Sequence, residues 1–287
     1  MFAIIGMVVV IGMIIAGYLM EHGNLHVLWQ PAELVIIFGA SFGSFLIMSP
    51  GRIVKVVLKN IANIFKNTGF DKQGYIELLV LLNELFRKIR KEGLLVLEAD
   101  VNDPHNSASF KDFKRVMANH HVLEFICANF KVIISSNISH HDLENLMEID
   151  MEASHHEAAL PGEMVTKVAD ALPGLGIVAA VLGVVITMGM ISEPPEVLGH
   201  SIGAALVGTF LGVLACYGFV GPIATNLEMQ AKDEAVILTV IKAALVSSVS
   251  GAAPQTAVEY GRRAIPGDNR PSLTELEEAI NQWSPKP

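Results

Sequence analysis

The side chains best suited to chemistry in this chain are its histidines. The 10 histidines include three adjacent pairs, and also His22 and His26, which are spaced by one helical turn. Adjacent histidines point to different faces of a helix, and His22 and His26 have no clear third ligand, so a metal site is not indicated. The sequence has no phosphate-binding loop, dinucleotide fingerprint or nucleophile elbow. We therefore expect no enzyme activity, no cofactor and no bound metal.

A second group of polar side chains lies inside long apolar stretches, and comprises Thr187, Ser201, Thr209 and Tyr217. Hydroxyls in such places either bond to a carbonyl of their own helix or line a wet path. Their spacing does not decide between the two.

Four stretches without a charged side chain are long enough to cross a bilayer: Met1–Met20, Leu34–Gly51, Ala171–Ser192 and Ser201–Leu227. A bilayer core about 30 Å thick needs roughly 20 apolar residues of helix. Because none of the four contains an acid or a base, an ionisable group at membrane depth would have to come from another chain. The sequence predicts an all-α polytopic membrane protein with four transmembrane helices and a helical cytoplasmic domain.

The distribution of basic residues predicts the orientation of these spans. All 20 Lys and Arg lie in two regions, Arg52–Lys167 and Lys232–Lys286, which the positive-inside rule assigns to the cytoplasm together with both termini. The net charge of −9 argues against nucleic acid as a partner. The predicted segments are transmembrane helices at 1–20, 32–51, 170–192 and 201–227, periplasmic loops at 21–31 and 193–200, and cytoplasmic segments at 52–169 and 228–287.

The cytoplasmic segments are predicted to be helical. One apolar face in Tyr75–Lys91 is formed by Leu78, Leu82 and Leu85, and Gly93 interrupts the pattern. If the helix passed Gly93 unbroken, Glu98 would lie on the same face as residues 84 and 91. Further helices are expected near 110–138 and 140–168.

Two spans are expected to extend into the cytoplasm as helices. Apolar residues at helical spacing follow the second span between 53 and 61, and the fourth span is expected to run to about Val249. Gly251 and Pro254 end it, and Ser272 with Glu275 forms a capping-box match that begins a short final helix.

Small residues and prolines mark the third and fourth spans. Gly208 and Gly212 form a GxxxG motif, a pattern typical of closely packed membrane helices. It indicates either packing between spans three and four or a surface at a protein or ion-conducting interface. Pro173 and Pro222 are expected at matched depth near the cytoplasmic face, either as helix-end residues or as a hinge.

The sequence resembles one known family over nearly its whole length and in the same order. The run Asp170-Ala-Leu-Pro-Gly-Leu-Gly-Ile-Val-Ala-Ala-Val-Leu-Gly-Val-Val185 resembles the third span of the MotA family of flagellar motor stator subunits. Val207-Gly-Thr-Phe-Leu-Gly212, with Tyr217-Gly-Phe219 and Pro222, resembles the fourth. Gln30-Pro-Ala-Glu-Leu-Val-Ile-Ile37 resembles the start of the second span, and Arg270-Pro-Ser-Leu-Thr-Glu-Leu-Glu-Glu278 resembles the C-terminal tail.

The resemblance implies an inner-membrane stator of five such subunits around two copies of a MotB-like partner. That partner is a single-span protein that supplies an ion-binding Asp and grips peptidoglycan. Ion flow would turn the subunit ring, and the cytoplasmic lobe would push the rotor protein FliG. By the same resemblance, Pro173 and Pro222 couple ion passage to movement, and Thr209 and Tyr217 face the partner helix. Arg90 and Glu98 would face the rotor, with Asp150 a weaker match.

The resemblance also bears on the ion and on the rival functions. Sodium-driven relatives carry Thr at the position of Ala180, so the methyl group here leaves fewer oxygen ligands and favours protons over Na⁺. The runner-up is an energiser of the TolQ or ExbB type, which the fourth span and the rotor-facing charges disfavour. An autonomous secondary transporter would need a polar site at mid-membrane and inverted repeats, and neither is visible.

Overall fold

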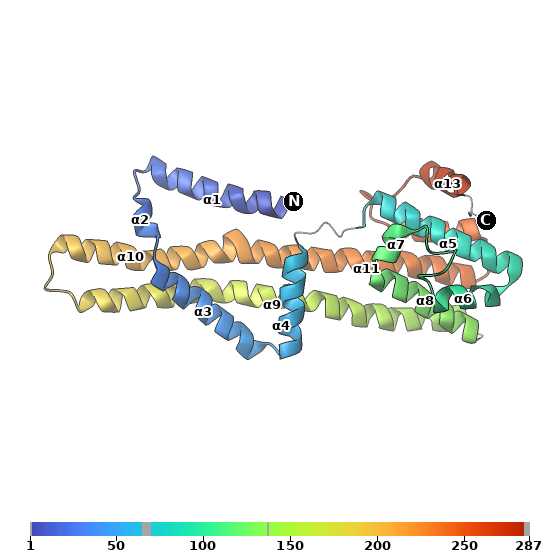
Figure 1. Ribbon diagram of the computed structural model, residues 1–287, viewed down its shortest axis with the longest axis horizontal. Coiled ribbons are helices and arrows are strands. Elements are labelled where there is room, and N and C mark those ends of the chain that lie inside the picture. The colour runs from blue at the N-terminus through green and yellow to red at the C-terminus, as the bar shows by residue number, and fades with distance from the viewer. Residues whose placement is uncertain (1, 65–69, 137, 284–287) are drawn as a thin grey trace. The chain divides into compact units, whose positions relative to one another are not determined.

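The computed structural model describes residues 2–64, 70–136 and 138–283. The first residue of the predicted first span, parts of the predicted cytoplasmic segment at 65–69 and 137, and the end of the tail at 284–287 lie outside them. Within the described residues the regular structure is helical and no strand is present, as the fold-class prediction requires. Figure 1 shows the order of the elements along the chain.

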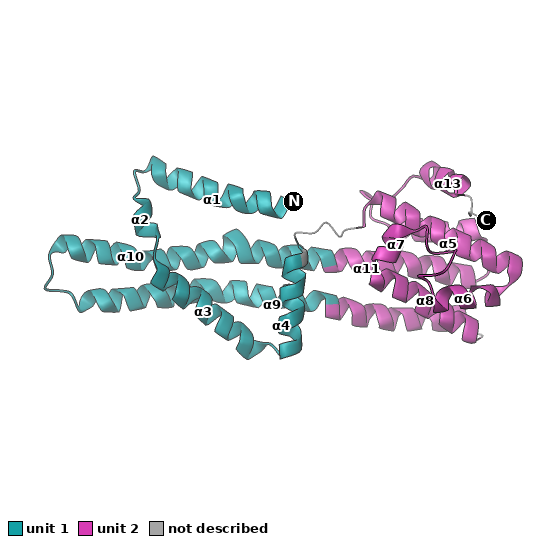
Figure 2. Cartoon of the chain, in the orientation of Figure 1, with its two compact units in different colours: residues 1–68, 158–230 teal, residues 69–157, 231–287 magenta. Residues whose placement is uncertain are grey.

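The chain forms two compact units, coloured separately in Figure 2. We call Met1–Thr68 with Ala158–Gln230 the membrane unit, and Gly69–Glu157 with Ala231–Pro287 the lobe. The sequence analysis treated 52–169 and 228–287 as separate segments, whereas the lobe combines parts of both. The reason is that helices from the C-terminal tail supply much of the lobe's core.

The membrane unit contains α1 (Phe2–Met20), α2 (Leu25–Leu28), α3 (Pro31–Met48), α4 (Gly51–Asn63), α10 (Pro195–Leu214) and the π-helix η2 (Ala215–Val220), together with parts of α9 (His140–Met188) and α11 (Gly221–Val249). Among the described residues, four helical stretches are long and apolar enough to cross a membrane: α1, α2–α3, α9 and α10–α11. The prediction of four spans is confirmed. The predicted boundary between residues 169 and 170 lies inside α9, which continues unbroken through it.

The expected continuation of the second span past residue 51 is wrong. The helix α3 ends at Met48, Ser49 is extended with φ −118° and ψ 122°, and Pro50 caps a separate helix, α4. A residue before proline is disfavoured in the helical region, because the proline ring collides with its backbone and Cβ. Figure 1 shows that the chain changes direction at this point, between α3 and α4. The apolar spacing beyond residue 51 belongs to α4, where Val57 packs against Met164 and Leu227.

The lobe contains α5 (Lys72–Glu92), the 3₁₀ turn η1 (Leu94–Leu97), α6 (Glu98–Asn102), α7 (Lys114–Ala118), α8 (His120–Ser135), α12 (Pro254–Ala264) and α13 (Leu273–Gln282), with the remaining parts of α9 and α11. The predicted apolar face of α5 is confirmed, since Leu78, Leu82 and Leu85 are fully buried. They belong to one core with residues of α8, α11 and α12.

Three helix ends in the lobe follow from local chemistry. The helix predicted near 110–138 is instead two helices, because Asn119 caps α8 by accepting a 3.2 Å hydrogen bond from the Val122 amide. Gly251, at φ 92°, adopts a backbone conformation that glycine tolerates, and it follows the end of α11 at Val249 as expected. The capping box of Ser272 and Glu275 at the start of α13 is confirmed.

In the membrane unit, the close approach of α9 to α10 predicts that replacing two neighbouring glycines by alanine will have very different effects on stability. A Cβ added to Gly176 would lie 2.7 Å from the Gly208 carbonyl oxygen, whereas one added to Gly174 meets nothing within 4 Å. We expect Gly176→Ala to cost about 1–3 kcal/mol through overpacking. The thermal midpoint should then fall by several degrees, measured by maleimide labelling of the buried Cys216 in detergent. Gly174→Ala serves as the matched control, and an equal fall in both variants would contradict this packing.

Candidate functional sites in the membrane unit and the lobe

The glycines of the third and fourth spans pack against each other within the chain. A Cβ at Gly212 would lie 2.6 Å from the Leu172 carbonyl oxygen, and one at Gly183 would lie 2.7 Å from the Cβ of Ala205. Both distances are too short for real atoms, so only glycine fits there. Of the two interpretations left open by the sequence, intramolecular packing therefore accounts for Gly176, Gly183, Gly208 and Gly212.

Three of the predicted ion-path residues, Ala180, Thr209 and Tyr217, lie at two different places in the membrane unit. Ala180 is buried beside Gly208, on the side that packs against α9. Thr209 and Tyr217 lie on another side, where they line an apolar cavity of about 520 Å³ with Val10, Ile14 and other residues of α1, α10 and η2. The structure thus brings Thr209 and Tyr217 together and leaves Ala180 apart from them.

The expectation that Pro173 and Pro222 lie at matched depth is wrong. Leu172, the residue before Pro173, lies level with Gly212 on α10. Ala224, two residues after Pro222, instead lies level with Gly162 on α9, since a Cβ added to Gly162 would be 3.4 Å from the Ala224 carbonyl oxygen. Pro222 is thus ten residues beyond Gly212 on the α10–α11 helix, about 15 Å at 1.5 Å per residue. Pro222 is the second residue of α11, which follows the π-helix η2 directly, and π turns are one of the features associated with helix kinks.

Glu33 is a membrane-unit acid whose place the sequence analysis missed. It lies in the first turn of α3, one residue before the uncharged stretch that began at Leu34. Its side chain is only 8% exposed, and its Oε2 is buried with no hydrogen-bond partner among the described residues. The statement that this chain supplies no acid at membrane depth is therefore corrected. The predicted transmembrane segment 32–51 already contains Glu33, but the argument for an acid-free interior used only the stretch Leu34–Gly51, which leaves it out.

In the lobe, the predicted rotor-facing charges lie on two elements. Gly93 has φ 85° and ends α5, so Arg90 is in the last turn of α5 and Glu98 begins α6. The predicted interruption at Gly93 is confirmed, so the condition under which Glu98 would share a face with residues 84 and 91 is not met. Both residues are exposed, and neither has an ion-pair partner in the part of the chain that the structure describes. Asp150, on α9, is also exposed.

The neighbouring charges, by contrast, are engaged inside the lobe. Arg87 pairs with Glu84 at 3.1 Å, and Lys88 pairs with Asp100 at 2.6 Å. Asp100 also accepts hydrogen bonds from the hydroxyls of Ser107 at 2.7 Å and Ser109 at 3.0 Å. Burial alone would raise the pKa of Asp100, but the hydrogen bonds and charge of Lys88, together with both serines, lower it below its usual value. This network fixes α6, and with it Glu98, against α5.

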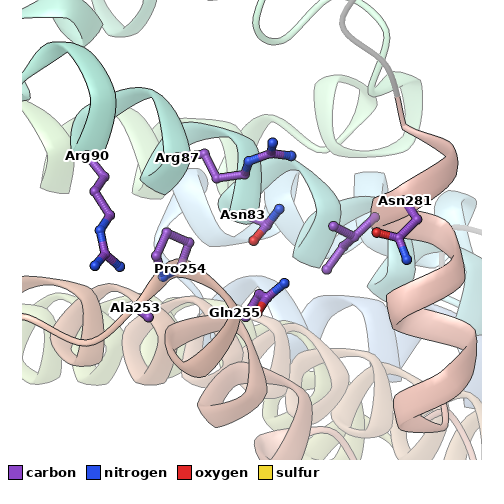
Figure 3. Close-up of a pocket in the computed structure, with 8 residues that line it drawn as sticks. Asn83, Arg87, Arg90, Ala253, Pro254, Gln255 and Asn281 are labelled. Carbon is purple, nitrogen blue, oxygen red and sulfur yellow. The ribbon is translucent and has the colours of Figure 1, made fainter.

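Arg90 also borders a cavity of about 320 Å³ beside α5. Figure 3 shows Arg90, Arg87 and Asn83 on one side of it, with Gln255 and Asn281 on the other. Asn83 is fully buried, and its amide oxygen and nitrogen have no hydrogen-bond partner among the described residues. The cavity gives Arg90 both polar and apolar neighbours.

Comparison with known proteins identifies the family. Residues 4–93 match the motility protein A N-terminal family, and residues 113–240 match the MotA/TolQ/ExbB proton channel family. The chain is 40% identical over 280 residues to motility protein A of Escherichia coli K12, covering 98% of this chain and 95% of that protein. It is 32% identical over 273 residues to chemotaxis protein LafT of Vibrio parahaemolyticus, covering 95% and 96%.

Two solved structures share the fold. The chain matches a structure of C. jejuni MotAB with a TM-score of 0.77 at 24% identity, covering 94% of this chain and 98% of that one. It matches the flagellar MotAB stator complex from Bacillus subtilis with a TM-score of 0.76 at 23% identity, covering 93% and 97%.

The four apolar helices and the match to the MotA/TolQ/ExbB proton channel family identify the chain as a multi-pass membrane protein related to proton channels. Within that class the chain belongs to the motility protein A family and is a stator subunit of the flagellar motor. The alternative of a TolQ- or ExbB-type energiser is not favoured, since the similar proteins include motility protein A of two bacteria and chemotaxis protein LafT.

The Asp100 network predicts a pH-dependent stabilisation of the lobe. Because the pKa of Asp100 is lowered by folding, its contribution is present above the unfolded value near 4 and is lost as the pH falls below it. At pH 7 we expect Asp100→Asn to cost about 1–2 kcal/mol, since hydrogen bonds to a charged group are weakened. Thermal labelling of the buried Cys127 measures this in the full chain. A cost that stays unchanged below pH 4 would contradict the assignment.

Proposed function

We propose that this subunit assembles as five copies around two copies of a MotB-like partner in the bacterial inner membrane. The partner would supply an ion-binding Asp, and ion flow would turn the ring so that the lobe drives the rotor protein FliG. The solved relatives are MotAB complexes, which supports a partner of this kind. The observation that carries torque transfer is the contrast in the lobe, where Arg90 and Glu98 are exposed and have no ion-pair partner among the described residues, while Lys88 is paired.

The proposed topology places both termini and the lobe in the cytoplasm. Every Lys and Arg lies within the proposed cytoplasmic segments 52–169 and 228–287, and the loops 21–31 and 193–200 contain none. The rotor-facing surface of Arg90, Glu98 and Asp150 is then on the side where the rotor lies.

Coupling is proposed to involve Pro173 and Pro222. Each removes a backbone hydrogen bond from a helix of the membrane unit, and they act at successive levels rather than as one hinge. Thr209 and Tyr217 are proposed to face the partner helix, because both already line one apolar cavity on α10 and η2. One elementary charge crossing 100 mV supplies about 2.3 kcal/mol, so torque must be built from many small steps.

Charge reversal in the lobe tests the rotor contact. Arg90→Glu and Glu98→Lys should each reduce swimming speed by about two-fold or more, because attraction across the contact becomes repulsion. Speed is measured by tracking cells, with membrane levels of the protein checked by immunoblot. Lys111→Glu makes the same charge change as Arg90→Glu at another exposed position of the lobe, and it should leave swimming speed unchanged. Normal speed in both reversed variants would refute this role for Arg90 and Glu98.

Ion choice is tested by removing one gradient at a time. Because Ala180 offers a methyl group where Na⁺ would need an oxygen ligand, we expect swimming to stop with a protonophore and to persist when sodium is replaced by potassium. Ala180→Thr measures whether a hydroxyl there changes the sodium dependence. Loss of swimming on sodium removal alone would mean that the ion is Na⁺.

A further inference from the structure

The Glu33 carboxyl occupies a cradle built from glycines on two other helices of the membrane unit. A Cβ at Gly208 on α10 would lie 2.6 Å from its Oε2, and one at Gly183 on α9 would lie 3.5 Å from its Oε1. Any side chain at Gly208 would therefore displace the carboxyl. The two glycines leave a space that the acid fills, and both lie inside the predicted spans 170–192 and 201–227.

The surroundings of the carboxyl are apolar. The same Cβ position at Gly208 is 3.1 Å from the Cβ of Ala179 and 3.1 Å from the backbone nitrogen of Ala180. The nearest hydroxyl on α9, that of Thr187, already donates a 2.9 Å hydrogen bond to the Gly183 carbonyl. The buried Oε2 of the acid thus has no hydrogen-bond partner among the described residues.

Charged and titratable groups on the surrounding elements are few and exposed. The part of α9 that follows Asp170 has none up to its end at Met188. The helix α10 carries Glu196 and His200 in its first two turns, and α2 carries His26, all of which are exposed. Glu33 takes part in none of the ion pairs found within 4.0 Å among the described residues.

A bare carboxylate buried in such a site costs several kcal/mol unless a proton or a cation neutralises it. A metal ion such as Na⁺ needs several oxygen ligands. The glycines and alanines around Glu33 present no side-chain oxygen, and backbone carbonyls inside a helix are already engaged in helical hydrogen bonds. A bound proton satisfies the site without further ligands. Intramembrane acids that face the inside of a helix bundle are commonly part of ion pathways.

We propose that Glu33 is a proton-binding site within this subunit, placed beside Ala180 on the path that the ions take. The site rests on the proposed function and adds an acid from this chain to the one that the partner supplies. Binding forms one O–H bond with a proton taken from water on the outer side. Release breaks that bond and returns the proton to water further along, so the carboxyl ends each cycle as it began.

The proton can be detected without any mutation. A neutral carboxylic acid in an apolar site adds its O–H across dicyclohexylcarbodiimide, and the adduct rearranges to a stable N-acylurea. We expect Glu33 to be labelled in the wild-type complex with its partner in lipid vesicles near pH 7, as seen by peptide mass spectrometry. The exposed Glu196 should stay unlabelled, and labelling of Glu33 should fall as the pH rises. Absence of label on Glu33 would overturn the proposal.

A matched set of variants tests whether the proton is on the path. Glu33→Gln and Gly208→Ala should each lower proton flux through the complex in liposomes by about three-fold or more, since one removes the acid and the other displaces it. Gly203→Ala is the control on the same helix, because a Cβ there meets nothing within 4 Å. Labelled Glu33 with unchanged flux in Glu33→Gln would overturn the proposal. A wild-type complex that carries no protons, but whose Glu33 is labelled with the expected pH dependence, would refute the proposed function and still support the proton site.

Discussion

The contact between the backbones of α9 and α10 positions every other feature of the membrane unit. Gly176, Gly208 and Gly212 allow main-chain atoms of the two helices to meet where any side chain would collide. In lipid the hydrophobic effect gives no advantage to helix association, so close van der Waals packing of small residues has to provide it. This contact fixes the levels of Pro173 and Pro222 and creates the space that Glu33 enters from α3.

Charged side chains have different surroundings in the two units, because those of the lobe are in contact with water and Glu33 of the membrane unit is buried. In the lobe, Lys88 and Asp100 are paired and further hydrogen bonded, while Arg90 and Glu98 are exposed to water, where a charge costs little. Exposed charges of this kind favour fast, reversible contacts with a partner. In the membrane unit, one acid lies among glycines and alanines, where only neutralisation makes its burial tolerable.

The sequence was sufficient wherever structure follows from local chemistry. Uncharged length predicted the four spans, periodicity predicted the buried face of Leu78, Leu82 and Leu85, and the capping box of Ser272 and Glu275 formed as expected. It was insufficient wherever two distant segments meet. The levels of Pro173 and Pro222 depend on how α9 pairs with α10–α11, and no spacing within one helix reveals that register. The roles proposed for Ala180, Thr209 and Tyr217 remain predictions from the family resemblance.

Glu33 shows why the sequence and the fold must be considered together. By position alone it is an acid in the first turn of a helix, where a negative charge is favourable and is usually exposed to solvent. The fold changes its meaning, because α3 packs against α10 and carries this turn into contact with Gly208 and Gly183. The helix N-terminus then offers the carboxyl a modest electrostatic benefit, while desolvation costs several kcal/mol. In the proposed site the cost exceeds the benefit and a bound proton offsets it, so the same burial that disfavours the charge suits the group to accept and release a proton.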